Sequence, residues 1–176
     1  MRCDRILLIG PRGAGKSAAG EALAARRGLS FHDADVEVER ATGRSIAALF
    51  AAGRFRADEA AALAALLSRR EGVVAAGGGA VLWPGLRNAV RGWTVVWLDA
   101  APAERARRIR GDAVARPSLT GRAADDELAA FAVRSLAYDA LAVDRVDTTR
   151  RTLVEVVDRI EKLLKTGDSA DSGNAD

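Results

Sequence analysis

The 176-residue sequence has one cysteine, one histidine and only 5% aromatic residues. A single cysteine, Cys3, forms no intramolecular disulfide, which excludes the disulfide-rich scaffolds of small secreted proteins and is typical of a reducing compartment. No apolar run approaches the roughly 20 residues that cross a bilayer. The short run at residues 6–9 leads into glycines and not into a signal-peptide cleavage site. We therefore expect a cytoplasmic protein with no membrane partner.

The sequence also lacks charge of one sign, since Lys and Arg number 27 and Asp and Glu 24, for a net charge of +3. The arginines are spread along the chain, so we expect a solvated surface and no nucleic-acid partner. The 49% of hydrophobic residues exclude a wholly disordered chain. The length favours one domain, which we predict over residues 1–165, and we expect a monomer. Residues 166–176 have no apolar anchor and predict a disordered tail.

Short apolar runs alternate with longer segments of helical periodicity. The runs predict strands over residues 6–9, 29–33, 73–76, 94–98 and 145–147. The periodic segments predict helices over residues 16–27, 35–42, 45–51, 57–69, 103–110, 124–141 and 152–165. Because parallel strands need helical crossovers, this alternation predicts an α/β three-layer fold with about five parallel strands and helices on both faces. In such folds ligands bind at the carboxyl ends of strands, here just after Ile9, Phe31, Ala76 and Leu98.

Residues 10–17, Gly-Pro-Arg-Gly-Ala-Gly-Lys-Ser, match the phosphate-binding P-loop pattern G-x-x-x-x-G-K-[ST] between a predicted strand and a predicted helix. Glycines let backbone N–H groups converge on phosphate oxygens, and the helix N-terminus adds positive potential. Lys16 can reach the β- and γ-phosphates, and the Ser17 hydroxyl can bind Mg²⁺. The motif indicates a nucleoside triphosphate site formed by Gly13, Ala14, Gly15, Lys16, Ser17 and Ala18.

Two parts of the sequence can supply the anionic ligand that Mg²⁺ needs beside Ser17. Asp99 follows an apolar run, as in a Walker B element. Asp33 and Asp35 stand at the end of a predicted strand, on the same side if the extended conformation persists. Such a carboxylate pair can divide its work between the metal and an acceptor hydroxyl. The same alternation points His32 away from them, as a packing or surface residue.

Two further segments have the composition of ligand-binding loops. Gly77, Gly78 and Gly79 follow an apolar run and permit close approach of the backbone to a ligand. A segment of about residues 111–124 carries glycines, a proline and arginines between two predicted helices. It predicts a mobile lid that closes over the nucleotide, excludes water and neutralises developing charge. The structural alternatives are a flexible turn and a solvated loop.

Several short motifs resemble, in their order, those of shikimate kinases, which are small P-loop kinases related to the nucleoside monophosphate kinases. The resemblance covers roughly residues 5–160. It rests on the P-loop, Asp33 with Asp35, residues 42–46, Phe55 and Arg56 with Glu59, residues 77–81, residues 116–119, and Arg134 shortly before Tyr138. Each motif after the P-loop is weak alone, but their joint occurrence is specific.

The resemblance implies phosphoryl transfer from ATP to the 3-hydroxyl of shikimate, which gives shikimate 3-phosphate and ADP on the route to chorismate and the aromatic amino acids. It implies Mg²⁺ held by Ser17 and Asp33, an acceptor hydroxyl held and deprotonated by Asp35, and Asp99 outside the metal site. The catalytic residues that it implies are Lys16, Asp35 and Arg116.

The resemblance also assigns arginines to the two substrates. Arg56 and Arg134 would hold the acceptor carboxylate beside the glycines at 77–79, because a guanidinium binds two oxygens at once. Glu59 lies three residues after Arg56 and can orient it, with an ordinary surface ion pair as the alternative. On the nucleotide side, the resemblance implies contacts from Arg108 with the adenine and from Arg116 in the lid.

Other functions remain compatible with parts of the sequence. A kinase of another polyol acid or of a cyclitol, such as gluconate, would keep the P-loop and change the region of Arg56 and Arg134. A guanine-specific switch is disfavoured, because neither Asn88 nor Asn174 lies in an Asn-Lys-x-Asp element. A non-catalytic nucleotide-binding regulator or RNA-binding module would not need Asp35.

Overall fold

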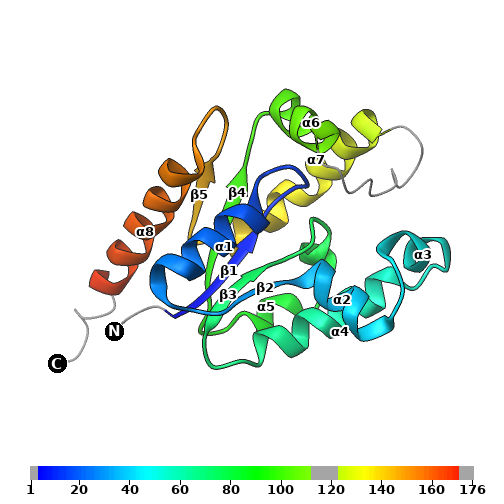
Figure 1. Cartoon of the computed structure of the whole chain (residues 1–176), viewed down its shortest axis with the longest axis horizontal. Helices are drawn as coiled ribbons and strands as arrows, with labels where there is room; N and C mark the ends of the chain where they lie inside the picture. The colour runs from blue at the N-terminus through cyan, green and yellow to red at the C-terminus, as the bar shows by residue number, and fades with distance from the viewer. Residues whose placement is uncertain (1–3, 112–122, 171–176) are drawn as a thin grey trace.

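The computed structural model describes residues 4–111 and 123–170, with side chains for residues 4–110 and 131–166. Within these residues, five strands form one parallel sheet in the order β2-β3-β1-β4-β5 (Figure 1). The strands are β1 (Arg5–Ile9), β2 (Phe31–Asp33), β3 (Gly72–Ala75), β4 (Thr94–Asp99) and β5 (Asp144–Asp147). The predicted α/β fold with five parallel strands is confirmed.

Helices connect the strands and cover both faces of the sheet (Figure 1). They are α1 (Lys16–Arg27), α2 (Ala34–Thr42), α3 (Ile46–Ala51), α4 (Phe55–Leu67), α5 (Leu86–Ala89), α6 (Pro102–Gly111), α7 (Ala123–Leu141) and α8 (Leu153–Ala170), with a 3-10 helix η1 (Ala80–Leu82). Sequence analysis missed η1 and α5, because three and four residues are too few to show a helical period.

The last helix extends past the end that the sequence predicts. Helix α8 continues to Ala170, whereas its predicted end is residue 165. Once a helix has nucleated, each added residue gains a backbone hydrogen bond without a new nucleation cost, so a helix can extend past its buried face. The rest of the predicted tail lies outside the described residues.

The side chains of β1 alternate between two hydrophobic cores, one on each face of the sheet. Ile6 and Leu8 pack in the core formed with α1 and α8, whereas Leu7 and Ile9 pack in the core formed with α4, α5 and α7. All four side chains are at most 1% exposed. This double burial explains why the central strands are continuous apolar runs in the sequence.

A smaller third core lies beside the sheet, where α2, α3 and α4 meet. Its members are Val38, Ile46, Leu49, Phe55 and Ala62. Helix α2 contacts both α4 and β2, and it follows β2 directly, so the start of α2 lies at the carboxyl end of β2. The first turn of α2, with its polar side chains, therefore lies there too.

The register of the sheet aligns the carboxyl ends of neighbouring strands. Asp33 of β2 pairs with Ala75 of β3, Leu8 of β1 also pairs with Ala75, and Ile9 pairs with Trp97 of β4. The loops that follow these strands therefore all begin on one side of the sheet, at the carboxyl ends of its strands. Parallel α/β sheets bind ligands at the carboxyl ends of their strands.

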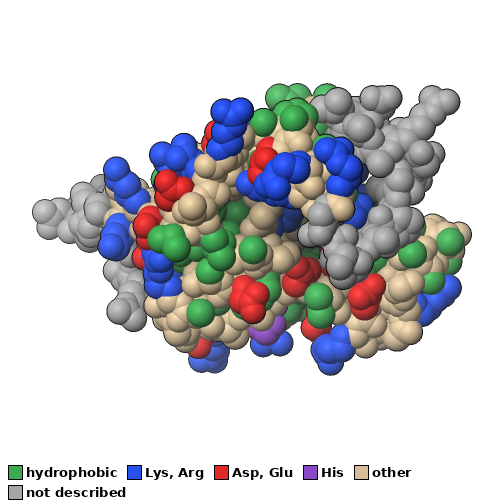
Figure 2. Space-filling view, turned by 45° about the horizontal axis from the view of Figure 1, so that its top comes forward, with side chains coloured by type: hydrophobic (Ala, Val, Ile, Leu, Met, Phe, Trp, Pro, Cys, Tyr) green, Lys and Arg blue, Asp and Glu red, His purple; other side chains and the backbone are tan. Residues whose placement is uncertain are grey.

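On the face in Figure 2, Lys and Arg side chains are interspersed with Asp and Glu side chains. Such a mixture is typical of a solvated surface. Along residues 4–170, apart from the gap at 112–122, no helix has the length and apolar content needed to span a bilayer.

Candidate active site

The P-loop joins β1 to α1, as predicted, and it presents the positive end of that helix. Gly15 is the N-cap residue, and the first turn of α1 contains no acidic side chain. The Nζ atom of Lys16 donates hydrogen bonds to the carbonyl oxygens of Gly10, at 2.8 Å, and Pro11, at 2.9 Å. The backbone N–H groups at the start of α1 and the Lys16 ammonium group thus lie on one loop, which is the arrangement that binds phosphate.

Ser17 and Asp33 meet at the carboxyl ends of β1 and β2. The Ser17 hydroxyl donates to Oδ2 of Asp33 at 2.5 Å. Oδ1 of Asp33 accepts a hydrogen bond from the backbone N–H of Asp35 at 2.9 Å, so Asp33 also caps α2. A hydroxyl and a carboxylate are the hard oxygen donors that Mg²⁺ prefers, and two protein donors leave positions for water and phosphate oxygens. The residues present therefore fit the predicted metal site.

The alternation argument for Asp33 and Asp35 was wrong, although the two residues do lie together. The strand ends at Asp33 and α2 begins at Ala34, so the chain is not extended through Asp35. Asp33 needs an extended backbone as an N-cap, and its carboxylate then accepts from the first turn of the helix. Asp35 reaches the site from that first turn. His32 is half-buried and its Nε2 atom lies 3.1 Å from Oγ of Ser30.

Arg56 and Glu59 form an ion pair on the first turns of α4. Nη1 of Arg56 donates to Oε2 of Glu59 at 2.6 Å. Glu59 is only 3% exposed, so this is not an ordinary surface pair. The buried carboxylate fixes the orientation of a guanidinium group that remains partly open to solvent.

The loop after β3 passes directly over this ion pair. A Cβ atom at Gly77 would overlap Oε1 of Glu59 and would lie 3.0 Å from Oδ1 of Asp35, and a Cβ atom at Gly79 would overlap the guanidinium of Arg56. Only glycine permits such an approach. The loop therefore brings Asp35, Arg56 and Glu59 to one place.

Helix α7 contributes a second guanidinium group at the same loop. Nη1 of Arg134 donates to the carbonyl oxygen of Gly78 at 3.3 Å, and the hydroxyl of the fully buried Tyr138 donates to the same oxygen at 2.5 Å. The ring of Tyr138 packs on Trp97 of β4 with 5.6 Å between centroids. The sheet thus anchors the part of α7 that carries Arg134.

The pKa of Glu59 depends on its burial and on the charged groups around it. Burial of its carboxyl raises the pKa of Glu59, while Arg56 opposes the rise by its charge and its hydrogen bond. The charge of Asp35 raises the pKa of Glu59 further, and the charge of Arg134 lowers it. Two carboxyl groups and two guanidinium groups therefore share one electrostatic environment.

Arg108 lies on the nucleotide side, between the P-loop and the turn after β5. Its Nη1 atom donates to the carbonyl oxygen of Gly13 at 3.2 Å, and its Nε atom donates to Glu104 at 2.9 Å. The hydrogen bond from Arg107, helped by the hydrogen bond from Arg108 and by both charges, lowers the pKa of Glu104 to about 2, although desolvation raises it. The structure thus places Arg108 beside the predicted nucleotide loop, and its stacking on an adenine stays a prediction.

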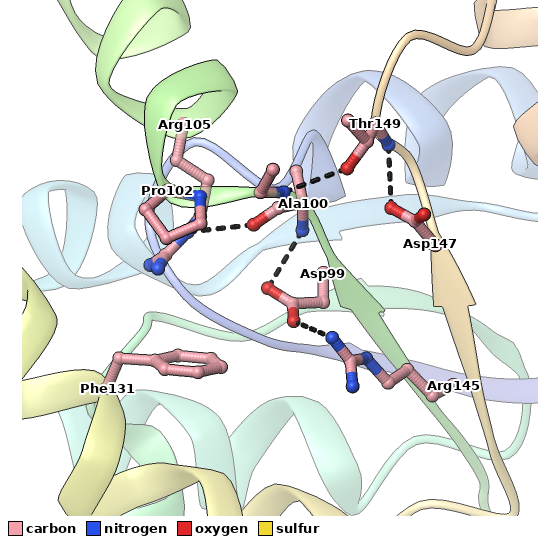
Figure 3. A pocket seen from close by; sticks show the side chains of 9 residues that line it. Asp99, Ala100, Pro102, Arg105, Phe131, Arg145, Asp147 and Thr149 are labelled. Atoms are coloured by element: carbon pink, nitrogen blue, oxygen red, sulfur yellow. Dashed lines mark hydrogen bonds and ion pairs between the residues drawn. The ribbon is translucent and has the colours of Figure 1, made fainter.

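Asp99, the alternative metal ligand, is engaged elsewhere (Figure 3). It is 2% exposed, and it accepts hydrogen bonds from the backbone N–H of Ala100 at 2.8 Å and from Arg145 at 2.5 Å. Arg145 in turn lies 4.5 Å from the centroid of Trp97. Asp99 lines a cavity of about 260 Å³ that Arg105 and Asp147 also line. The oxygens of Asp99 bind Ala100 and Arg145, whereas the carboxylate that contacts the P-loop serine is that of Asp33.

The predicted site residues thus fall into two groups that meet at the edge of the sheet. The nucleotide group lies in the P-loop, the first turn of α1 and the adjoining α6, and comprises Gly13, Ala14, Gly15, Lys16, Ser17, Ala18 and Arg108. The acceptor group surrounds the loop after β3 and comprises Asp35, Arg56, Gly77, Gly78, Gly79 and Arg134. Arg116 and most of the predicted lid lie outside the described residues.

Sequence analysis missed Thr148, which directly follows β5. Its buried hydroxyl donates to the carbonyl oxygen of Ala14 in the P-loop at 3.0 Å. The rule that ligands bind at the carboxyl ends of parallel strands points to this position. Residues 145–147 contain a single apolar side chain, so the sequence pattern does not mark the end of this strand as clearly as the ends of the other four.

A P-loop with a carboxylate beside its serine, next to a pocket of guanidinium and carboxyl groups, defines a small-molecule kinase. A family model described as shikimate kinase matches residues 12–165. The shikimate kinase of Mycobacterium avium (strain 104) is 41% identical over 169 residues, which make up 94% of this chain and 96% of that protein. That of Mycobacterium tuberculosis (strain CDC 1551 / Oshkosh) is 42% identical over 165 residues, 92% and 93% of the two chains. The chain belongs to the shikimate kinase family.

Solved structures agree with this assignment. A shikimate kinase from Acinetobacter baumannii in complex with shikimate has a TM-score of 0.80 and 28% identity, covering 92% of this chain and 93% of that one. A gluconokinase from Sinorhizobium meliloti 1021 has a TM-score of 0.70 at 18% identity, covering 99% and 100% of the chains, and shares the fold. The predicted family and enzyme class are confirmed.

Proposed function

We propose that this protein transfers the γ-phosphoryl group of ATP to the 3-hydroxyl of shikimate, with ADP and shikimate 3-phosphate as products. The observation that carries the proposal is the meeting of Asp35, Arg56 and Arg134 around the loop after β3, next to the P-loop. Shikimate has one carboxylate and several hydroxyls. A pocket with two guanidinium groups and the carboxyl group of Asp35 matches this chemistry.

Arg56 and Arg134 would bind the carboxylate of the acceptor. Glu59 holds the Arg56 guanidinium through Nη1, which leaves the other donor edge of this planar group for the substrate. Arg134 already donates to the Gly78 carbonyl oxygen at 3.3 Å, so its position is fixed from α7. Orienting both cations before the substrate binds reduces the ordering cost of binding.

Asp35 would hold the reacting hydroxyl and accept its proton. As that proton leaves, the acceptor oxygen forms a bond to the γ-phosphorus, and the bond from phosphorus to the β–γ bridging oxygen breaks, so that ADP departs with the electron pair. Lys16 would exchange its contacts with the Gly10 and Pro11 carbonyl oxygens for contacts with phosphate oxygens. Its positive charge then opposes the charge that develops on the transferred group.

Ser17 and Asp33 are the residues that would hold Mg²⁺, through the two oxygens that lie 2.5 Å apart. When bound, the cation neutralises phosphate charge. Asp33 has a second task in the fold, because its other oxygen caps α2. The carboxylate is therefore oriented whether or not a metal is bound. We also propose Arg116 as the lid arginine, and a cytoplasmic monomer as the working form.

A coupled assay of ADP release with shikimate, quinate, gluconate and no acceptor tests the proposal. We expect kcat/KM for shikimate to exceed that for each other acid at least a hundredfold, since a site built for one set of hydroxyls leaves buried polar groups unpaired with the wrong one. A higher kcat/KM for gluconate than for shikimate would show that gluconate, and not shikimate, is the acceptor. Equal ADP release without any acceptor would remove the kinase assignment altogether. Sedimentation velocity of the same preparation tests the monomer.

A further inference from the structure

Thr148 lies at a junction between three parts of the nucleotide side. It is 2% exposed and follows β5 directly. Its hydroxyl donates to the carbonyl oxygen of Ala14 at 3.0 Å and accepts from Nη1 of Arg108 at 2.9 Å. Its own carbonyl oxygen accepts from Nη2 of Arg108 at 2.7 Å. The side chain thus joins the P-loop to α6.

The hydrogen bond to Ala14 determines more than the position of one oxygen. In a planar trans peptide the carbonyl oxygen and the following N–H point in opposite directions. When Thr148 holds the Ala14 oxygen, the N–H of Gly15 must point away from Thr148. Gly15 is the N-cap of α1, so this N–H belongs to the row of donors that meets phosphate at a helix N-terminus.

The preceding peptide is held in a similar way. The Gly13 carbonyl oxygen accepts from Nη1 of Arg108 at 3.2 Å, and the Ala14 N–H donates to the Pro11 carbonyl oxygen at 3.3 Å in a turn of the loop. Two consecutive carbonyl groups of the P-loop are therefore held from outside the loop. Thr148 contacts one directly, and it also accepts a hydrogen bond from the arginine that contacts the other.

We propose that Thr148 is a positioning residue for the nucleotide phosphates, which acts by orienting the Ala14–Gly15 peptide so that the Gly15 N–H points at the bound phosphate group. The inference rests on the proposed nucleotide site and extends it to the end of β5. In this proposal Thr148 acts through the peptide that it holds and not by contact with a substrate. The glycines of a P-loop make it adaptable, and contacts from Thr148 after β5 and from Arg108 of α6 restrict it to the conformation that binds.

The test compares Thr148→Val with Thr148→Ser. Valine keeps the shape of threonine and removes the hydroxyl, whereas serine keeps the hydroxyl. We expect Thr148→Val to raise KM for ATP about tenfold, which corresponds to about 1.4 kcal/mol, and to leave KM for the acceptor within twofold. Thr148→Ser should stay within threefold of the unchanged protein for both substrates.

Thr149→Val is the matched control from the same turn, because the Thr149 hydroxyl accepts from the N–H of Ala101 and does not contact the P-loop. It should change KM for ATP by less than twofold. A merely structural role for Thr148 would lower the melting temperature and leave the ratio of the two KM values unchanged. That result, or an equal rise of KM for ATP in Thr149→Val, overturns the proposal.

A measurement on the unchanged protein keeps the test independent of variant folding. With ¹⁵N-glycine labelling, titration with ADP and Mg²⁺ should shift the Gly15 amide strongly and the amide of the distant Gly53 little. A Gly15 amide that does not respond while ADP binds overturns the role of Thr148 and leaves the nucleotide site standing. Absence of any ADP binding by the unchanged protein would overturn the proposed function, and the inference with it.

Discussion

The two halves of the candidate site use different chemical groups, backbone groups on the nucleotide side and charged side chains on the acceptor side. On the nucleotide side, backbone groups do most of the work: carbonyl oxygens of Gly10 and Pro11 hold Lys16, and outside side chains hold the carbonyl oxygens of Gly13 and Ala14. On the acceptor side, charged side chains from three helices surround a glycine loop. Backbone sites depend on conformation, whereas side-chain sites depend on the identity of each residue.

This difference indicates which half of the site can change the choice of phosphoryl acceptor. A phosphate-binding loop can keep its geometry while its non-glycine side chains vary, because the ligand contacts N–H groups. The acceptor pocket has no such tolerance, since a lysine cannot replace the two-pronged contact of an arginine. We expect substitutions on the nucleotide side to affect every acceptor equally, and substitutions on the acceptor side to change the choice of acceptor.

Lys16→Met should have the largest effect, because the Lys16 ammonium group lies at the P-loop itself, where it can meet phosphate oxygens. We expect kcat to fall about a thousandfold or more for any acceptor. The ADP-release assay measures it, with the exposed Lys162→Met of α8 as a control that keeps full activity. A selective loss with one acceptor only would break the distinction between the two halves.

Asp35→Asn should lower kcat about a hundredfold or more and leave the dissociation constant for ATP within threefold. An amide can hold the acceptor hydroxyl but cannot take its proton. Isothermal titration with a nonhydrolysable ATP analogue, together with the turnover assay, separates the two effects. Asp139→Asn, at an exposed position of α7, serves as the control. Normal turnover by Asp35→Asn would remove Asp35 from proton transfer.

Arg134→Lys sharpens the comparison at a smaller scale. We expect KM for shikimate to rise about tenfold while KM for ATP changes less than twofold, since lysine keeps the charge and loses the two-pronged contact. Initial rates with each substrate varied in turn measure both constants, and Arg40→Lys, in an exposed ion pair of α2, is the control. Equal rises of both constants would assign Arg134 to the fold of α7 instead of the acceptor.

Glu59→Gln should give the smallest effect, on the pH dependence of stability. Because burial raises the pKa of Glu59 above its ordinary value of 4.5, the native state binds this proton more tightly than the unfolded chain. The stability that Glu59 contributes is fully present below pH 4.5 and falls as the pH rises through the raised pKa. Glutamine abolishes this titration, so the unfolding free energy of the variant should decline less between pH 4.5 and 7.5.

Urea unfolding at four pH values across that range measures the difference. Glu37→Gln is the matched control, because the hydrogen bond from Arg40 lowers the pKa of Glu37, so its titration lies below the range. The slope of stability against pH should therefore be the same in Glu37→Gln and in the unchanged protein. An unchanged slope in Glu59→Gln would mean that Glu59 is ionised throughout, as an ordinary partner of Arg56.

The local motifs of the candidate site could be read from the sequence, whereas the way in which the chain brings them together could not. The P-loop was readable because its residues act through local backbone geometry next to a strand and a helix. The premise that placed Asp33 and Asp35 together was wrong, since a helix cap and not an extended strand brings them together. The burial of Glu59 and the contact of Thr148 with Ala14 depend on residues far apart in the chain, which no local pattern reports.

The order of the strands has a consequence for the reaction geometry. Asp35 and the predicted acceptor loop at residues 77–79 follow β2 and β3, the P-loop follows β1, which is adjacent to β3, and Asp99 and Thr148 lie at the ends of β4 and β5. Neighbouring strands are about 4.8 Å apart. The strand order therefore determines how far the phosphoryl donor lies from the acceptor hydroxyl. An extra strand between β3 and β1 would add this strand spacing to the gap between the reacting atoms, which must come to about 3–3.5 Å. Adjacency of β3 and β1 is thus a condition of the chemistry as well as of the fold.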